Sequence, residues 1–272
     1  MYSLHKISVS TIFIFLFSSA SGGDPFFPAA GAGEAGMGWS CVTKPGFWSS
    51  FHNQALLPFN STASAGINYH GRFGISELGT RSAALIVPVE NAGLGIIYSH
   101  FGCRDLARHS AGLACGLKLS EKISAGVQAD FFAEKTAGEY RERRSLSFEA
   151  GLHIMISEQA CLGIHVFNPV PGALRRDYLP SSLRIGAGIM LSRELSVSSE
   201  AELSTDGGPD IRTGFEYSPS GSLRLRGGFS SQGNSFCFSV GYRLKQVQID
   251  LGFSTHYSLG ISSSASIIFS LK

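Results

Sequence analysis

From Thr62 to the end of the chain, the sequence repeats one pattern: apolar residues alternate with polar residues or glycine, in segments separated by turn residues. Successive side chains of an extended chain point to opposite faces, so a period of two predicts β-strands with one apolar and one polar face. Such strands make an all-β chain, either as a closed barrel or as a sandwich of two sheets. The alternation predicts fourteen strands, over residues 62–70, 80–88, 92–100, 108–119, 122–132, 144–156, 159–168, 181–191, 194–204, 210–218, 221–230, 234–245, 246–255 and 258–271.

Charge is divided unequally between the two faces of these strands. The polar face collects six basic and six acidic residues: Lys118, Asp130, Glu149, Arg184, Glu200, Glu202, Arg212, Glu216, Arg224, Arg226, Arg243 and Asp250. We expect the apolar face to carry no Asp, Glu, Lys or Arg. A Lys or Arg that faces lipid at the bilayer midplane costs about 2–4 kcal/mol, so the apolar face suits an outer wall and the charged face a barrel interior. A soluble sandwich would bury the apolar face instead, but only 15% of the residues are charged, against about 25% in typical globular chains.

The lengths of the connections give an independent indication of a barrel. Tight turns near 88–92, 120–121, 157–158, 192–193, 218–220 and 245–246 alternate with connections near 71–79, 101–107, 133–143, 169–180, 205–209, 231–233 and 256–257, several of which are long. Short periplasmic turns and longer extracellular loops alternate in this way in outer-membrane barrels. The sequence therefore predicts a closed antiparallel transmembrane β-barrel of about 14 strands within residues 61–272.

The first residues read as an export signal. Lys6 supplies a positive flank, residues 7–17 form an apolar run, and Ser18, Ser19 and Ala20 are small residues suited to cleavage. We predict a signal peptide over residues 1–20, cleaved after Ala20, and a location in the bacterial outer membrane. Removing the leader takes away Lys6 and leaves 21 Lys and Arg against 20 Asp and Glu, so no basic bias indicates nucleic acid. Five cysteines without a CxxC pair give no metal-ligand spacing, and nothing in the sequence indicates a cofactor.

Residues 21–60 do not alternate and are rich in glycine, proline and aromatic residues. We predict that this segment is a periplasmic extension or a plug within the barrel. One interpretation is that its aromatic side chains bind a hydrophobic ligand as part of a hatch. The favoured interpretation is that they pack the plug or anchor it at the membrane interface. These candidates are Phe26, Phe27, Trp39, Phe47, Trp48 and Phe51.

The polar face of the strands allows two chemical interpretations. Glu149 and His153 lie on one face of one predicted strand, and His165 lies on the next, so a hydrolase site can be imagined. Nothing beyond their proximity supports catalysis, and we expect no enzyme. The arginines and glutamates of the later strands could instead form a charged constriction for a solute. We favour a self-compensating network in a filled lumen, because equal numbers of opposite charges leave no net field to select an ion.

The segment before the first strand also carries a family resemblance. Gly36-Met37-Gly38, followed after a gap by Asn53-Gln54-Ala55-Leu56-Leu57 and then by alternating strands, resembles the PorV/PorQ-type proteins of Bacteroidota. These belong to a wider FadL-like group of 14-stranded barrels. The closing residues 255–262, Thr-His-Tyr-Ser-Leu-Gly-Ile-Ser, are similar to the last hairpin of that group.

The resemblance implies a non-enzymatic component of type IX secretion that engages secretion-system or surface proteins at the outer membrane. This is the main expectation from the sequence. The alternative, implied by the wider group, is a FadL-like passive transporter of hydrophobic small molecules, with the N-terminal segment as a hatch. On that reading Asn53 joins the aromatic residues as a hatch candidate.

Overall fold

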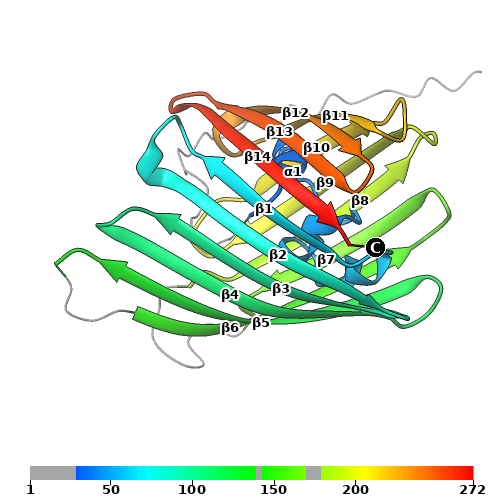
Figure 1. Cartoon of the computed structure of the whole chain (residues 1–272), viewed down its shortest axis with the longest axis horizontal. Coiled ribbons are helices and arrows are strands. Elements are labelled where there is room, and N and C mark those ends of the chain that lie inside the picture. Colours follow the sequence, from blue (N-terminus) through cyan, green and yellow to red (C-terminus); the bar gives the residue numbers. More distant parts are fainter. Residues whose placement is uncertain (1–28, 139–142, 170–178, 272) are drawn as a thin grey trace, which may run out of the picture.

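The computed structural model describes residues 29–138, 143–169 and 179–271, and the signal-peptide prediction and Phe26 and Phe27 lie outside these ranges. Fourteen antiparallel strands each pair with the next one in sequence, and β1 pairs with β14 to close the barrel (Figure 1). The predicted all-β closed barrel is therefore confirmed. The strands are β1 Ser64–Gly71, β2 Gly79–Val89, β3 Ala92–Gly102, β4 Leu106–Lys118, β5 Ile123–Thr136, β6 Arg143–Met155, β7 Ala160–Phe167, β8 Ser182–Met190, β9 Leu195–Ser204, β10 Asp210–Tyr217, β11 Leu223–Ser230, β12 Ser235–Leu244, β13 Val247–His256 and β14 Gly260–Ser270.

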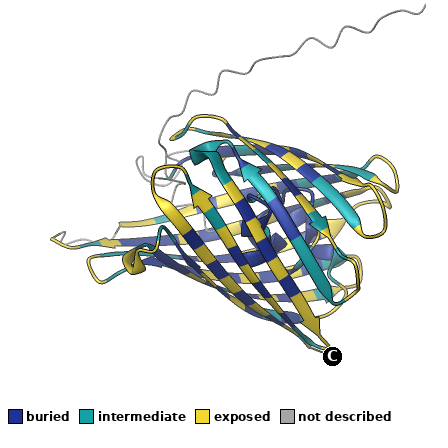
Figure 2. Ribbon diagram, turned by 90° about the horizontal axis from the view of Figure 1, so that it is seen from above, coloured by how far each residue is buried: buried dark blue, intermediate teal, exposed yellow. Residues whose placement is uncertain are grey.

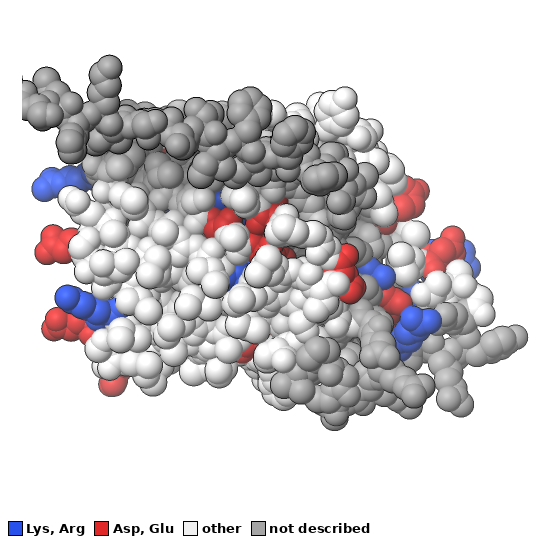
Figure 3. Space-filling model, turned by 180° about the vertical axis from the view of Figure 1, so that it is seen from behind, with Lys and Arg blue, Asp and Glu red and all other residues white. Residues whose placement is uncertain are grey.

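The alternation of the sequence appears as alternating exposure along each strand (Figure 2). In β13, Ile249 and Leu251 are about half exposed, while Gln248 and Asp250 are buried. In the middle of the strands, the exposed residues form the outer wall and the buried ones face the interior. This wall is largely free of charge, and charged side chains gather toward its two ends, with a small group near the middle of the view in Figure 3.

One expectation about the outer wall is wrong. Arg81 and Arg144 share the parity of the apolar residues within the predicted strands 80–88 and 144–156, and they face outward, as the register of β2 to β6 shows. Lys135, which lies beyond the predicted strand 122–132, also faces outward. Each lies at an end of its strand, because β2 begins at Gly79, β5 continues to Thr136, and β6 begins at Arg143. The cost of an outward charge falls to about 0–1 kcal/mol away from the bilayer midplane, so strand ends tolerate these residues.

The two ends of the barrel differ. The "turn end" holds the short connections 90–91, 119–122, 156–159, 191–194, 218–222 and 245–246, and the "loop end" holds the other connections. Both ends of the barrel chain meet at the turn end, where the Leu271 amide donates to the Ala63 carbonyl over 2.6 Å. Two short 3₁₀ helices, η3 (Ser76–Leu78) and η4 (Gln232–Asn234), lie in loop-end connections.

Within the described residues before the first strand, the chain forms three short helices inside the barrel. They are α1 (Ala32–Gly36), η1 (Phe47–Phe51) and η2 (Gln54–Phe59) (Figure 1). None of the helices in the described ranges is long and apolar enough to cross a membrane. We call residues Ala30–Phe59 the lumenal segment.

Candidate functional site

The lumenal segment touches the inner wall on every side. Helix α1 contacts β1 and β11–β14, and η1 and η2 together contact β2–β6. The remaining strands are met by the stretch between the helices, where Val42 faces β7 and β8 and Met37 faces β10. The backbone amides of Cys41 and Val42 reach β9 through Glu200. The segment therefore crosses the lumen rather than lining one wall of it.

Inward glycines make room for the backbone of the segment. A Cβ atom on Gly214 would lie 2.5 Å from the Met37 carbonyl oxygen, and one on Gly163 would lie 2.4 Å from that of Val42. Both distances are shorter than any normal carbon–oxygen contact, so a side chain there would displace the segment. The same close approach recurs at Gly93, Gly116, Gly126, Gly228 and Gly252. The inward-facing glycines thus mark the positions at which the backbone of the segment lies against the barrel wall.

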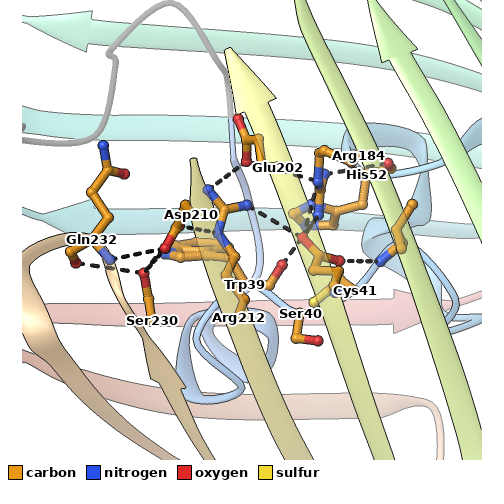
Figure 4. Close-up of polar contacts among 12 residues, drawn as sticks. Trp39, Ser40, Cys41, His52, Arg184, Glu202, Asp210, Arg212, Ser230 and Gln232 are labelled. Atoms are coloured by element: carbon orange, nitrogen blue, oxygen red, sulfur yellow. Dashed lines mark hydrogen bonds and ion pairs between the residues drawn. The ribbon is translucent and has the colours of Figure 1, made fainter. Parts of the chain in front are cut away.

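Polar contacts fix the middle of the segment to β8 and β9 (Figure 4). One carboxylate oxygen of Glu200 accepts from the Cys41 and Val42 amides, each over 2.9 Å. Arg184 donates to the Trp39 carbonyl oxygen over 3.1 Å and to the other Glu200 oxygen over 2.7 Å. Both the negative and the positive member of a buried ion pair therefore also hold the backbone of the segment.

Asn53 is a structural connector within the segment. Its side-chain oxygen accepts from the Ala55 amide over 3.1 Å and so caps the start of η2. Its side-chain nitrogen donates to the Val42 carbonyl oxygen over 2.8 Å, which ties η2 to the stretch that faces β7 and β8.

The inward charges form two groups of ion pairs. In the first, Arg212 lies 2.5 Å from Glu202, 2.6 Å from Asp210 and 3.3 Å from Glu200, which also pairs with Arg184. In the second, Arg226 lies 2.5 Å from Glu216 and 2.8 Å from Asp250. Lys44 of the lumenal segment joins this second group, 2.6 Å from Glu216. The segment is thus held by both groups.

Other predicted network residues lie apart from these pairs. Arg224 and Arg243 both donate to the Gln248 side-chain oxygen over 2.8 Å. His165 contacts Glu149 over 2.9 Å, and Gln54 of η2 donates to the same carboxylate over 2.5 Å.

His153 packs edge-on against Phe59 with ring centroids 5.3 Å apart, and neither ring nitrogen has a hydrogen-bond partner among the described residues. The geometry does not join His153 to Glu149 and His165 as the imagined hydrolase site requires.

A cavity of about 220 Å³ lies above the segment at the loop end. Trp39, Phe51 and His52 of the segment form its floor, and Phe73 and Phe167 add aromatic rings to its wall. The predicted network residues on its wall are Glu149, His165, Arg184, Glu202 and Arg212. The remaining network residues lie outside this wall.

The predicted aromatic candidates separate into two kinds. Trp39 lines the cavity, whereas Phe47 and Trp48 are buried in the apolar core with ring centroids 4.8 Å apart. Phe51 belongs to both, because it lies in the same apolar cluster and also lines the cavity. Sequence reasoning missed His52, His70, Phe73, Phe167 and Asp210 of the cavity wall. Asp210 shares its strand face with Arg212, so the alternation could have indicated it. Phe73 and His52 lie in irregular stretches that carry no periodic signal.

Trp39 is the most unusual residue of the floor. Its φ of 64° lies in the left-handed region, which is costly for a bulky residue and is found mostly where surrounding contacts impose it. Its ring packs edge-on against His70 at 5.6 Å and is tilted against His52 at 5.9 Å. His52 contacts the Ala30 carbonyl oxygen over 2.8 Å, and burial, aided by Arg184, lowers the pKa of His52 to about 3. The floor therefore presents neutral rings to the cavity at neutral pH.

Comparison with known proteins gives structural matches only: no family model and no curated protein matches the sequence. The fold is similar to that of the CymD monoaromatic hydrocarbon channel, with 12% identity and a TM-score of 0.69 over 90% of this chain and 98% of that one. It is similar to the P. putida toluene transporter TodX, with 11% identity and a TM-score of 0.70 over 90% and 99%. A Pseudomonas aeruginosa FadL homologue matches with 13% identity and a TM-score of 0.61 over 89% and 97%.

These neighbours correct the main functional expectation. They are hydrocarbon channels or transporters and a FadL homologue, so the expected PorV/PorQ-type component of type IX secretion is wrong. The broader part of the resemblance holds, because the barrel has the fold of the FadL-like outer-membrane channels.

Proposed function

We propose that this protein is a non-enzymatic outer-membrane channel for the passive passage of small, neutral, hydrophobic molecules. The observation that carries the proposal is the cavity of about 220 Å³, which is floored by Trp39 and Phe51 and lies above a segment that crosses the whole lumen. The neighbouring structures are a hydrocarbon channel and a toluene transporter, which fits this class of solute.

The size of the cavity supports a solute with one ring. An apolar cavity of about 150 Å³ is large enough to hold benzene, whereas drug-sized ligands occupy roughly 300–1,000 Å³. The cavity of about 220 Å³ lies between these sizes. Aromatic rings of the floor and wall supply the apolar contact area that such a ring needs.

The charges of the cavity favour a neutral solute over a carboxylate. Its wall carries Arg184 and Arg212, but both are already paired with acidic side chains. The ionisable residues of the wall include four acids against three arginines: Glu149, Glu202, Asp206, Asp210, Arg72, Arg184 and Arg212. A carboxylate entering this wall would therefore meet Arg184 and Arg212 already paired, and would have to break a buried ion pair to bind them.

Passage requires the floor to move. The lumenal segment is the hatch in this proposal, and its contacts with Glu200 and Arg184 hold it closed. Arg184 donates its hydrogen bond to the carbonyl oxygen of Trp39. A solute that packs against the Trp39 ring would therefore touch the same residue that Arg184 holds. Solute binding and release of the hatch would thus act on the same short stretch of chain.

Uptake by whole bacterial cells tests the proposal. Cells that lack other hydrocarbon channels and express this protein should accumulate dilute labelled toluene faster than cells with the empty vector. Trp39→Ala should change this rate several-fold, whereas Phe236→Ala on the outer wall, where that residue is 68% exposed, should not. Equal rates with and without the protein would refute the proposed transport.

A further inference from the structure

The outer wall of β2–β6 carries a line of basic side chains near the loop end. Arg81 of β2 lies opposite His100 of β3, and His100 lies opposite His109 of β4. His109 lies opposite Ala133 of β5, which lies opposite Arg144 of β6. Residues directly opposite in an antiparallel pair point to the same face of the sheet. We call Arg81, His100, His109, Lys135 and Arg144 the basic row, since Lys135 follows Ala133 by two residues on the same face.

The basic row faces outward. Tyr98, Phe131 and Leu146 share its parity in β3, β5 and β6, and each is 43–51% exposed on the outer wall. Arg81, Lys135 and Arg144 are exposed, and His100 and His109 are half-buried.

The row is also confined to one sector of the barrel. Within the described parts of the strands, its five members are the only Asp, Glu, Lys, Arg or His residues that face outward, and none of them is acidic. If these side chains only marked the boundary between the membrane and water, basic residues should occur on outward faces all around the barrel. The outward faces of β1 and β7–β14 instead carry none in the described residues.

Two charges of the row, Arg81 and Lys135, have no acidic partner among the described residues. By contrast, Arg184, Arg212 and Arg226 all have acidic partners inside the barrel. Neighbouring strands lie about 4.8 Å apart, so a row across five strands extends over roughly 19 Å. A row of this width that includes two basic side chains without a described acidic partner fits an anionic ligand.

Local contacts order the middle of the row. The Tyr98 hydroxyl and the Nδ1 atom of His109 are hydrogen-bonded over 2.8 Å, and the rings of His100 and His109 pack edge-on at 4.7 Å. Toward the turn end from this point, the wall is apolar, with Ile96 and Leu113 both more than half exposed. The surface therefore combines a basic band with an apolar wall beside it, as the headgroup and the acyl chains of a lipid require.

We propose that the basic row binds the phosphate groups of an outer-leaflet lipid whose acyl chains lie against β2–β5. Arginine matches phosphate oxygens with two parallel donors, and lysine adds a point charge. The site is separate from the cavity, and it depends on the barrel's place in the outer membrane but not on what the channel carries.

The test measures lipid binding to the purified full-length protein by native mass spectrometry. The probes are diphosphoryl lipid A, the same lipid with both phosphates removed, and inorganic phosphate. Arg81→Gln and Lys135→Gln should each weaken binding of the phosphorylated lipid roughly fivefold, because one basic residue near an anionic surface contributes about 1 kcal/mol. The double variant should lose roughly 25-fold, and Arg81→Lys should retain most of the affinity.

The matched control is Arg193→Gln, which removes one exposed arginine from a connection at the turn end. It should leave lipid binding unchanged. The proposal is overturned if the phosphorylated and dephosphorylated lipids bind equally, if Arg193→Gln costs as much as Arg81→Gln, or if inorganic phosphate alone accounts for the binding. Toluene uptake by Arg81→Gln should stay normal, so the lipid site and the transport proposal fail separately.

Discussion

The two sides of the lumen hold the same segment by different physical means. Toward β1–β4, the segment packs Phe47, Trp48 and Leu57 against Ile86 and Ile97 in a continuous apolar core. Toward β8–β13, it is held by hydrogen bonds and ion pairs that involve Arg184, Glu200 and Glu216. Apolar packing is insensitive to charge and to the direction of approach, whereas ion pairs are directional and depend on both partners. If the lumenal segment moves as the transport proposal requires, we expect its apolar side to stay anchored and its ion-paired side to release.

The largest effect is expected on the apolar side. Trp48 is 1% exposed, so Trp48→Ala should lower the free energy of unfolding by about 3–5 kcal/mol through lost burial and the cavity it leaves. Denaturant titration in detergent measures this change. Phe236→Ala on the outer wall is the control and should cost much less. A similar loss for the two variants would remove the distinction between the core and the wall.

The ion-pair side should show coupling instead of simple loss. Glu200→Gln or Arg184→Met alone should destabilise the protein by about 3 kcal/mol, since each leaves a buried charge without its partner. The double variant should cost less than the sum of the two single changes, by about 1–3 kcal/mol. A double-mutant cycle of unfolding free energies measures this difference. Additive effects would mean that the two residues hold the segment independently.

The close glycine contacts offer a way to loosen the lumenal segment without removing a charge. Gly214→Ala places a methyl group 2.5 Å from the Met37 carbonyl oxygen and should destabilise the observed position of the lumenal segment by about 1–3 kcal/mol. Cys41, which is 1% exposed, should then react faster with a thiol reagent when the other four cysteines are replaced by serine.

Gly208→Ala is the matched control for this change, because a Cβ atom there meets nothing within 4 Å. Its Cys41 labelling rate should equal that of the parent protein. Unchanged labelling in Gly214→Ala as well would show that the segment is not displaced by the added methyl group.

The smallest effect concerns pH. Burial lowers the pKa of His52 from 6.5 to about 3, so the folded protein keeps this ring neutral while the unfolded chain takes up a proton below about pH 6.5. Stability from this group is therefore present above pH 6.5 and lost as pH falls toward 3, by about 2 kcal/mol at pH 5. His52→Gln should reduce the difference in unfolding free energy between pH 8 and pH 5 by this amount.

Burial raises the pKa of Glu34, which acts in the opposite sense, so only the difference between the variant and its parent is informative. If His52→Gln leaves the pH dependence unchanged, His52 is not held neutral by its surroundings.

The barrel could be predicted from the sequence because every strand has one face toward lipid and the other toward the lumen. Residues such as Ile249 and Asp250 alternate between lipid and lumen, and this period of two is visible without any tertiary information. The predicted ends of the strands were less accurate than their positions. Strand β5 continues four residues beyond its predicted end at 132, and this extension brings Lys135 onto the outer face.

The site was harder to predict. The lumenal segment consists of short helices whose positions are set by contacts with distant strands, such as that of Met37 with Gly214, and not by local periodicity. Trp39 and Trp48 look alike in the sequence, yet one lines the cavity and the other lies in the core. Motif residues such as Asn53 report how the segment is folded and not what the cavity accepts, which is why they led to the wrong functional class.

The most direct test of the transport account is binding of a neutral and a charged ring to the cavity. The protein has two tryptophans, so Trp48→Phe leaves Trp39 as the only fluorescent reporter of this kind. Titration of this variant in detergent with toluene should change the Trp39 emission saturably, and benzoate, which has a similar ring and a carboxylate, should bind at least tenfold more weakly. No saturable change with toluene, or equal affinity for the two compounds, would contradict the account.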